Sequence, residues 1–315
     1  MRIAVSGSSG LIGSALVAHL RAEGHEVLRL VRHAAAPGSG SAAFDPRQGL
    51  VDAAALENLD GVVHLAGAGV ADGRWTKARR AEILASRSLP TLALARTLAG
   101  LSKKPRVLVA ASAVGAYGSR GDAWQTEDSP RGQGFLAEVC RAWEEACAPA
   151  AAAGIRVVNL RFGVVLSRHG GALAKMLTPF KLGAGGRIGP GTQWMPWVSL
   201  EDAVAAAAFA LTHDALSGPV NVTAPQAVTT RAFPKALGRA LRRPTIAPLP
   251  AFAARLLFGR MADEMLLAST RAAPTRLEAA RFVFQHRDID AALAAALSDA
   301  ARPSSAPSGE AVAAS

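Results

Sequence analysis

The first 24 residues of the chain contain, in immediate succession, an apolar segment, a glycine-rich turn and an amphipathic helix. Residues 2–6 have the length and hydrophobicity of a buried strand, and Gly7, Gly10 and Gly13 follow directly. Apolar residues then recur at every fourth position as far as Leu20, which predicts a helix that ends before Gly24. A strand that turns through glycines into a helix is typical of the first unit of a dinucleotide-binding parallel sheet.

Each glycine of this turn meets a separate physical requirement. Gly7 permits a tight turn out of the strand, Gly10 lets backbone N–H groups approach a pyrophosphate, and Gly13 lets the helix pack closely on the sheet. The spacing is three and three, whereas the common fingerprint has two and three, so a glycine-rich turn without a ligand remains an alternative. The helix N-terminus would add free N–H donors and partial positive charge. The residues predicted to hold the phosphates are Gly7, Ser8, Ser9, Gly10, Leu11, Ile12 and Gly13.

Segments of the same two kinds alternate along the next 200 residues. Helices are predicted over 75–98, with a disturbance at Pro90, and over 203–211. Strands are predicted over 26–31, 60–67, 106–111, 156–162 and 219–222. The alternation predicts an α/β fold, namely a Rossmann-type doubly wound parallel sheet with a smaller, mostly helical C-terminal substrate domain.

The composition changes after Leu166, and this change sets the expected domain boundaries. Glycine is dense from 170 to 191, and helical patterns dominate from 230 to 297. We expect residues 1–166 to form the nucleotide-binding domain, with 195–222 returning to it. Residues 167–194 and 223–297 would form the substrate-side domain, and the Ser/Pro/Ala-rich residues 298–315 a disordered tail.

Composition and charge disfavour several other classes of protein. No apolar run reaches the roughly 18 to 20 residues of a membrane span, and a strand that begins at Arg2 leaves no room for a signal peptide. Cys140 and Cys147 cannot form a disulfide framework and have no accompanying His cluster, so we expect no metal site and a cytoplasmic location. The net charge of +11 would suit nucleic acid, but scattered basic residues and few aromatics make that partner unlikely.

The end of the second predicted strand bears on the choice of cofactor. NAD enzymes place an acid there to bind the ribose hydroxyls, whereas this chain has Leu30-Val31-Arg32-His33. An arginine at this point can pair with a 2′-phosphate and stack on adenine. We therefore expect Arg32 to favour NADP (NADPH), against the alternative of an exposed arginine at a strand end.

Together these segments resemble the short-chain dehydrogenase/reductase superfamily in its extended and atypical branches. They are most similar to a group within the NAD-dependent epimerase family that carries its own C-terminal domain, and the resemblance covers residues 1 to about 297. The motifs that carry it are Gly7-x-x-Gly10-x-x-Gly13, His64-Leu-Ala-Gly67, Gly73-Arg-Trp75, Ser86-Arg87, Ser112 with Tyr117-Gly118, Trp143-Glu144-Glu145, Leu160-Arg-Phe-Gly-Val-Val-Leu166, Met176-Leu-Thr-Pro-Phe-Lys-Leu-Gly183, Gly185-Gly-Arg-Ile-Gly-Pro-Gly191, Pro196-Trp-Val-Ser-Leu-Glu-Asp202 and Pro274-x-Arg276-Leu277.

The resemblance implies further cofactor contacts beyond the glycine turn. Leu65 and Ala66 end a strand where such folds pass the cofactor's ribose, and Val165 lies just beyond the strand that reaches the nicotinamide. Glu82 and Arg87 on the long helix resemble positions that face the cofactor. A solvated charge pair on a helix face is the alternative for these last two residues.

The resemblance also implies a proton-transfer site, which this sequence matches only in part. In the superfamily a Ser holds the substrate oxygen, a Tyr transfers the proton and a Lys four residues later lowers the pKa of the Tyr. Ser112 and the chain's single tyrosine, Tyr117, are the candidates, but Tyr117 has no Lys partner. Counting back from Glu144 places Leu136 and Cys140 where the Tyr and Lys are usual, and counting from the next residue gives Ala137 and Arg141. We expect Ser112 and Tyr117 to face a pocket beside the nicotinamide, and Cys140 to occupy the place of the Lys.

Two functional hypotheses follow. The first is an NADP-dependent oxidoreductase or epimerase acting on a carbonyl or nucleotide-sugar-like small molecule, with proton transfer by Tyr117 or by an acid of the adjacent loop, Asp122 or Glu127. The second is a non-catalytic NADP-binding regulatory or redox-sensing protein, which the missing Tyr-x-x-x-Lys pair favours. Arg161 is expected to fix a carboxylate within the fold, and His64 to be structural.

Overall fold

The computed structural model describes residues 1–33, 35–36 and 38–298. Its centre is an eight-stranded sheet in the order β12-β8-β6-β5-β1-β2-β3-β4, in which only the β3–β4 pairing is antiparallel. The predicted Rossmann-type parallel sheet is therefore confirmed. The strands of this sheet are β1 (Arg2–Ser6), β2 (Glu26–Val31), β3 (Ser41–Asp45), β4 (Leu50–Val51), β5 (Gly61–His64), β6 (Val107–Ala113), β8 (Arg156–Phe162) and β12 (Gly218–Val222).

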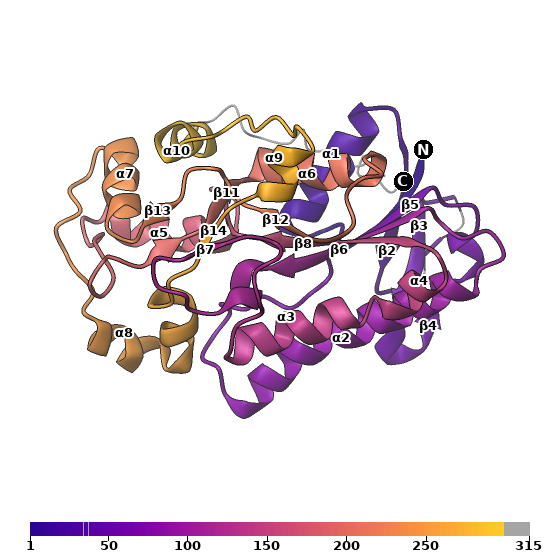
Figure 1. Cartoon of the computed structure of the whole chain (residues 1–315), viewed down its shortest axis with the longest axis horizontal. Helices are drawn as coiled ribbons and strands as arrows, with labels where there is room; N and C mark the ends of the chain where they lie inside the picture. Colours follow the sequence, from indigo (N-terminus) through magenta and orange to yellow (C-terminus); the bar gives the residue numbers. More distant parts are fainter. Residues whose placement is uncertain (34, 37, 299–315) are drawn as a thin grey trace, which may run out of the picture.

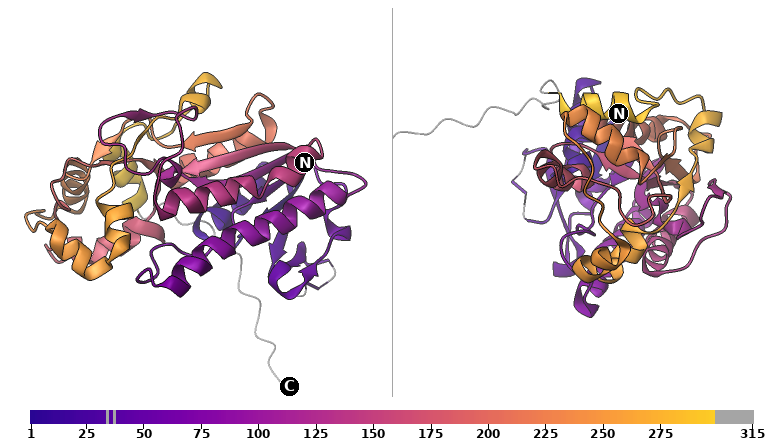
Figure 2. Two further views of the ribbon diagram at one scale, coloured as in Figure 1. Left: turned by 60° about the horizontal axis from the view of Figure 1, so that its bottom comes forward. Right: turned by 90° about the vertical axis from the view of Figure 1, so that its left-hand side faces the viewer.

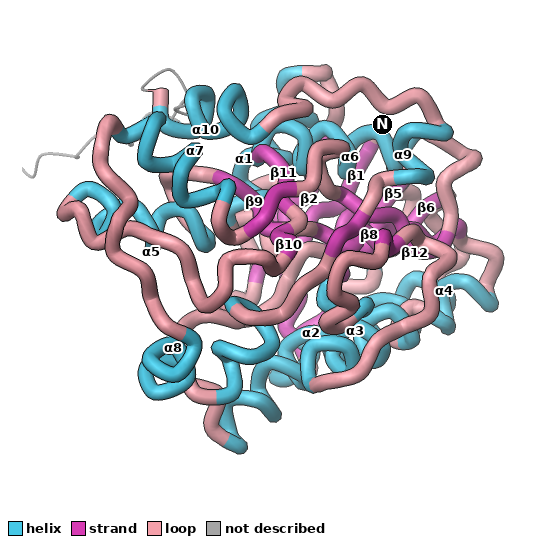
Figure 3. The backbone as a smooth tube through the Cα atoms, turned by 60° about the vertical axis from the view of Figure 1, so that its left-hand side comes forward, coloured by secondary structure: helices cyan, strands magenta, loops and turns pink. Residues whose placement is uncertain are grey.

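Helices cover both faces of this sheet (Figures 1 and 3). One face carries α1 (Leu11–Ala22), α6 (Leu200–Thr212) and α9 (Thr275–Ala279), and the other carries α2 (Lys77–Gly100), α3 (Phe135–Glu145) and α4 (Ala148–Ala152). The strands alternate their side chains between two separate hydrophobic cores. In β1, Ile3 and Val5 enter the core under α1 and α6, whereas Ala4 enters the core under α2.

Local sequence explains where the main helices begin. The Ser199 hydroxyl accepts a hydrogen bond from the backbone N–H of Asp202 at 3.0 Å and so caps α6. Thr76 caps α2 in the same way through the N–H of Arg79. Three short 3₁₀ turns connect other elements, namely η1 (Pro46–Gln48), η2 (Ala54–Leu56) and η3 (Val114–Tyr117).

A smaller, mostly helical part gathers at one end of the sheet (Figure 2). Its helices are α5 (Gly171–Lys181), α7 (Ala232–Leu241), α8 (Ala251–Phe258), the π-helical turn η4 (Ala262–Leu266) and α10 (Ile289–Leu297). Three two-stranded pairings join this part to the large sheet's loops. They are β9 (Val164–Leu166) with β11 (Trp197–Ser199), β10 (Trp194–Met195) with β13 (Val228–Thr229), and β7 (Trp124–Gln125) with β14 (Arg271–Ala272).

The expected strands of the large sheet are present within a few residues of their predicted limits, but β3 and β4 were missed. Ser41–Asp45 contains little that predicts a strand, and it forms one because its backbone extends the sheet at the edge of β2. The expected domain boundaries stay a prediction, and residues 299–315 of the expected tail lie outside the described residues. In the part of the chain that the structure describes, no helix is both long and apolar enough to cross a membrane.

Candidate functional site

A large cleft lies where the strand order of the sheet reverses. From β1 the chain proceeds outward through β2 and β3, and then returns to the other side of β1 to form β5 and β6. A cleft of about 730 Å³ opens at the carboxyl ends of these strands, between the turn after β1 and the loop after β5. Ligands of open α/β sheets bind at such reversal points. We refer to this feature as the large cleft.

The glycine turn forms one wall of the large cleft. Gly7 has φ of +66°, and a Cβ there would lie 2.8 Å from the carbonyl carbon of Leu65. A Cβ at Gly13 would lie 2.1 Å from the carbonyl oxygen of Gly7, so both positions exclude a side chain. The Gly10 N–H donates to that same oxygen at 2.9 Å and closes the turn. The turn therefore brings backbone, without side chains, to the edge of the cleft.

The predicted phosphate-binding residues divide into two sets. Gly7, Ser8, Ser9 and Gly10 line the large cleft. Behind them, the Leu11 side chain lies beside Gly170, Ile12 packs against the core, and Gly13 is buried. Cofactor contact by any of the seven residues stays a prediction.

One end of the large cleft is strongly basic. Arg32 lines it as predicted by position, and its side chain is exposed. Arg29 and Arg47 line the same end, and the Arg29 Nε donates a hydrogen bond to the Ser8 Oγ at 3.3 Å. The acid at this end, Asp45, is already engaged, because its carboxylate accepts from the Arg47 N–H and from the Gln48 amide. Three arginines, from the end of β2 and the turn after β3, therefore line the cleft.

The opposite wall is formed by the loop after β5 and by α2. Leu65 and Ala66 line the large cleft, and so do Glu82 and Ser86 on the helix. Glu82 forms an ion pair with Arg79 at 2.7 Å. The alternative of a charge pair between Glu82 and Arg87 is therefore wrong. The Ser86 Oγ accepts a hydrogen bond from the Ala68 N–H at 3.2 Å and fixes the loop to the helix.

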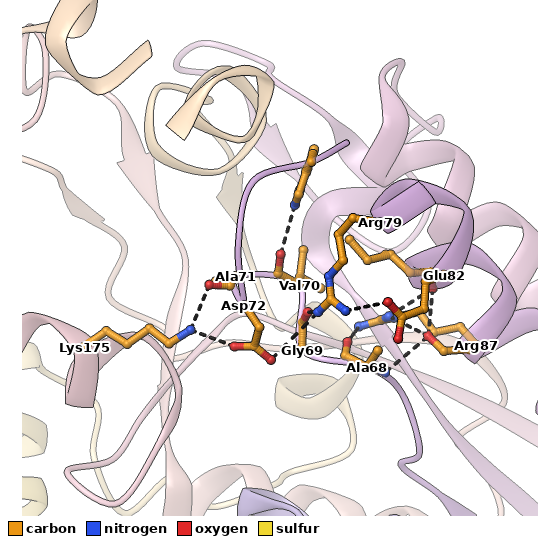
Figure 4. A network of polar contacts seen from close by, with 12 residues as sticks. Ala68, Gly69, Val70, Ala71, Asp72, Arg79, Glu82, Arg87 and Lys175 are labelled. Carbon is orange, nitrogen blue, oxygen red and sulfur yellow. Dashed lines mark hydrogen bonds and ion pairs between the residues drawn. The ribbon is translucent and has the colours of Figure 1, made fainter. Parts of the chain in front are cut away.

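Side chains hold the 67–76 loop in place by its carbonyl groups (Figure 4). Four consecutive carbonyl oxygens, those of residues 68 to 71, each accept a hydrogen bond from a side chain. The donors are Arg87 to Ala68, Arg79 to Gly69, Trp75 to Val70 and Lys175 to Ala71. Lys175 belongs to α5 and also pairs with Asp72 at 2.8 Å, so it ties this loop to the smaller part of the protein.

Arg87 supports the loop from behind. Its side chain is buried, and its guanidinium lies 5.0 Å from the ring centre of Trp143. Burial lowers the pKa of Arg87 from its ordinary value. The alternative of a solvated charge is therefore wrong for Arg87, while its contact with a cofactor stays a prediction. Val165, the last implied contact, lies in β9 opposite Val198 and packs against the core under α1 and α6.

Ser112 and Tyr117 are buried, and neither is among the residues that line the large cleft. The expectation that they face a pocket beside the nicotinamide stays a prediction. The Ser112 hydroxyl donates to the Glu144 carboxylate at 2.7 Å, and both side chains are buried. Tyr117 is fully buried, where its hydroxyl donates to Asn221 Oδ1 at 2.7 Å and accepts from Arg161 at 2.9 Å. The physical reason is that two buried charged side chains, Glu144 and Arg161, need hydrogen-bond partners, and the two hydroxyls provide them. Proton transfer by either residue stays a prediction that this geometry disfavours.

The buried charges are Arg161 and Glu144, which form a bidentate ion pair. The Arg161 Nε and Nη2 donate to the two Glu144 oxygens at 2.9 and 3.0 Å, and Arg131 donates to one of them at 2.7 Å. Burial disfavours the Arg161 charge, but the hydrogen bonds and charge of Glu144 outweigh this and raise the pKa of Arg161. The expectation that Arg161 fixes a carboxylate within the fold is confirmed.

Leu136 and Cys140 face the carboxyl end of β6. A Cβ on Gly115 would lie 3.2 Å from the Leu136 Cβ and 3.8 Å from the Cys140 sulfur. The Cys140 thiol donates to the Ala113 carbonyl at 3.5 Å, and burial raises its pKa to about 11. A protonated thiol cannot supply the positive charge of a lysine, so it leaves no tuned proton donor at this place.

His64, Glu127 and two tryptophans that flank Pro196 have structural contacts. His64 is fully buried, its Nδ1 lies 2.6 Å from the Ser6 hydroxyl, and burial lowers its pKa to about 4. Trp197 is buried and donates to the Gln226 carbonyl, whereas Trp194 donates to Asp122 and stacks on Arg271. The Glu127 carboxylate accepts hydrogen bonds from the N–H groups of Asn221 and Arg276, so it braces the fold.

Comparison with known proteins decides the family. The NAD dependent epimerase/dehydratase family matches residues 3–223. The chain belongs to this family. A second match, to a domain of unknown function named DUF1731, covers residues 249–296 and corresponds to the C-terminal helical region of the structure.

Similar family members span nearly the whole chain. The epimerase family protein Mb2239 of Mycobacterium bovis is 47% identical over 291 residues, which are 92% of this chain and 96% of that protein. The crystal structure of the human epimerase family protein SDR39U1 with NADPH has a TM-score of 0.86 at 35% identity, and covers 94% of this chain and 98% of its own. A nucleoside-diphosphate sugar epimerase from Corynebacterium glutamicum has a TM-score of 0.76 at 39% identity, over 93% of this chain and 57% of that one.

Some residues of the large cleft were missed by the sequence argument. Arg29 carried a signal, since it is the polar residue inside an otherwise apolar strand, but its outward direction was not inferred. Arg47 and Gln48 carried none, because they reach the cleft only through the unpredicted β3 and the turn after it. Ser86 belonged to a motif of the resemblance, although its contact with the loop could not be read from spacing.

Proposed function

We propose that the large cleft is an NADP site. Its glycine turn presents backbone where a Cβ would clash, which leaves room for a phosphate to approach. The observation that carries the choice of NADP over NAD is the set of three arginines, Arg29, Arg32 and Arg47, at one end of the cleft. The SDR39U1 structure was solved with NADPH, which supports the same choice for this relative.

The residues present fit the cofactor in charge and shape. Arg32, with Arg29 and Arg47 beside it, would hold the 2′-phosphate, while the turn from Gly7 to Gly10 would hold the pyrophosphate. Leu65 and Ala66 would close the opposite wall with small apolar surface. When bound, NADPH supplies hydride-transfer chemistry.

We further propose that the protein is an SDR-type oxidoreductase or epimerase acting on a small molecule with a carbonyl or sugar-like group. Family membership supports this class, and the name of the Corynebacterium relative makes nucleotide sugars one candidate substrate class. Both cysteines are free and buried, which accords with a proposed cytoplasmic location.

A second candidate is a non-catalytic NADP-binding regulatory or redox-sensing protein. Ser112 and Tyr117 are committed to the Glu144–Arg161 pair, and Leu136 and Cys140 stand where the Tyr and Lys are usual. These are the observations that favour a cofactor-binding protein without the superfamily's proton relay. The two candidates share the NADP site and differ only in turnover.

The NADP site is tested by Arg32→Glu, with binding of NADPH and NADH followed by the quenching of tryptophan fluorescence. One charge-assisted contact contributes about 1.5 to 3 kcal/mol, so we expect NADPH affinity to fall about tenfold or more and NADH affinity to change little. Arg96→Glu makes the same charge change at an exposed position of α2 outside the cleft and serves as the control. Equal wild-type affinity for the two cofactors would contradict the assignment of Arg32.

Turnover separates the two candidates. Oxidation of NADPH is followed by the loss of its absorbance against panels of aldehydes and ketones. Epimerisation leaves no net change in the cofactor, so nucleotide sugars are instead tested by NMR analysis of the products. Turnover in either assay that depends on one substrate class supports the enzyme. Tight NADPH binding with neither oxidation nor epimerisation across the panels supports the sensor.

A further inference from the structure

A second, smaller cavity lies away from the large cleft and between distant parts of the chain. Its volume is about 110 Å³. Gly115 and Ser119 after β6, Leu136 at the start of α3, and Asp263, Glu264 and Thr270 from the C-terminal region contribute to its walls. We refer to it as the small cavity.

The small cavity lies at the same edge of the sheet as the large cleft. Gly115 follows β6, and β6 pairs in parallel with β5, whose following loop forms a wall of the large cleft. Leu136 lines the small cavity at the place where the superfamily's tyrosine is expected from the position of Glu144. A substrate of the proposed reaction would have to approach here, so this inference rests on the proposed function.

Glu264 is the fixed polar group of the small cavity. Its Oε2 accepts a hydrogen bond from the Leu136 N–H at 2.8 Å, which holds the carboxylate at the N-terminus of α3. Gly134 makes this approach possible, since its φ is +106° and a Cβ there would lie 3.2 Å from Oε2. Among residues 1–33, 35–36 and 38–298, none donates a hydrogen bond to the other oxygen, Oε1. Glu264 therefore has one anchored oxygen and one available to a ligand.

The backbone around Glu264 is unusual as well. Residues Ala262–Leu266 form a π-helical turn, a conformation that occurs frequently at functional sites. The neighbouring acid, Asp263, already has a charged partner, because it forms an exposed ion pair with Arg255 at 2.8 Å. Glu264 is therefore the acid of the small cavity whose charge is open to a ligand.

Charge and size restrict what the small cavity can bind. Of the described residues that line it, none is Lys, Arg or His, so nothing there would pair with a diphosphate. A carboxylate within hydrogen-bond reach would repel one. Pockets for drug-sized ligands measure about 300 to 1,000 Å³, well above the volume of this one.

We propose that the small cavity binds the substrate of this protein, and that the substrate is a small neutral or positively charged polar molecule rather than a nucleotide sugar. The Glu264 Oε1 accepts an N–H or O–H group of that molecule. Ser119 and Thr270 also line the cavity, and their hydroxyls are held by the Ser269 N–H and the Gly118 carbonyl. Leu136 and Gly115 supply an apolar wall. Glu264 thus sets specificity by charge, in the part of the site where the family's usual tyrosine is replaced.

The experiment uses the full chain with saturating NADPH and two probes, 1-amino-2-propanol and UDP-glucose, with binding measured by ligand-observed NMR. We expect the amino alcohol to bind the holoprotein and UDP-glucose to show no saturable binding. Glu264→Gln should weaken the amino alcohol about tenfold or more, because it removes the charge. Glutamine can still accept from the Leu136 N–H, so the helix end is retained.

Glu138→Gln is the matched control, because Glu138 lies exposed in the first turn of the same helix and outside the small cavity. It should leave binding of both probes unchanged. Saturable binding of UDP-glucose, no binding of the amino alcohol, or an unchanged affinity in Glu264→Gln would each overturn the proposal while the NADP site stands. Failure of the wild-type protein to bind NADPH would instead overturn the proposed function on which it rests.

Discussion

Replacement of Tyr117 by phenylalanine separates a structural role for the single tyrosine from a catalytic one. Its hydroxyl donates to Asn221 Oδ1 and accepts from Arg161, and all three side chains are buried. Burial raises the pKa of Tyr117, although Arg161 opposes this effect, so the phenol stays protonated at neutral pH. Tyr117→Phe removes one donor and one acceptor while keeping the ring.

The expected cost follows from the partners that are left behind. An N–H of Arg161 and the carbonyl oxygen of Asn221 would both lose a buried hydrogen bond, and leaving such groups unpaired costs about 1 to 3 kcal/mol. In a domain of this size, roughly 1 kcal/mol lowers Tm by about 2 to 4 °C. We therefore expect Tyr117→Phe to lower Tm by roughly 2 to 12 °C and to leave NADPH affinity unchanged.

Differential scanning calorimetry measures this shift, with Ser88→Ala as the control. The Ser88 hydroxyl donates only to the carbonyl of Leu84 in its own helix, so its loss should change Tm far less. If Tyr117→Phe kept the wild-type Tm and abolished a measured turnover, the structural account of Tyr117 would be refuted.

Three further predictions concern the turn, the buried histidine and the loop. Gly13→Ala should reduce NADPH affinity at least about tenfold in fluorescence titrations, because its Cβ would lie 2.1 Å from the Gly7 carbonyl oxygen. Gly100→Ala is the control, and it should leave NADPH affinity unchanged because the space around Gly100 is open. Burial lowers the pKa of His64 to about 4, so as the pH falls the unfolded chain binds a proton at this residue before the folded chain does. The contribution of His64 to the free energy of unfolding should therefore be complete above about pH 6.5 and be lost towards pH 4. The same pH titration of His64→Gln should give a flatter profile. Lys175→Met removes the contacts with Ala71 and Asp72. Because Lys175 is exposed, the change should lower the free energy of unfolding by less than about 1 kcal/mol. It should nevertheless speed proteolytic cleavage within residues 67–76, compared with the control variant Lys181→Met.

The sequence predicted the parts of the fold that local sterics decide. The order of strand, glycine turn and helix at the N-terminus follows from residues within two dozen positions of one another, and the structure has β1, the turn and α1 in that order. It did not predict β3, because Ser41–Asp45 becomes a strand only through backbone pairing with β2. Arg47 reaches the large cleft as a consequence of that pairing, so its position was equally hidden.

The surroundings of Ser112 and Tyr117 could not be predicted for a different reason. Spacing placed Ser112 at the end of a strand and Tyr117 in the loop beyond, and both positions are right. Their directions depend on the buried pair of Glu144 and Arg161, which come from a helix and a strand further along the chain and take up both hydroxyls. Glu264 was missed because about 130 residues separate it from Leu136, the residue that it contacts.

Hydrogen exchange of the full chain with and without NADPH tests the central claim, the NADP site in the large cleft, most directly. Slower exchange is predicted for amides of residues 7–13 in the glycine turn, 65–68 after β5, and 44–48 beside the arginines, since these segments line the cleft or directly continue its wall. NADH at equal concentration should protect the first two segments less and leave 44–48 nearly unchanged. Protection confined to other segments, or equal protection of 44–48 by the two cofactors, would contradict the account.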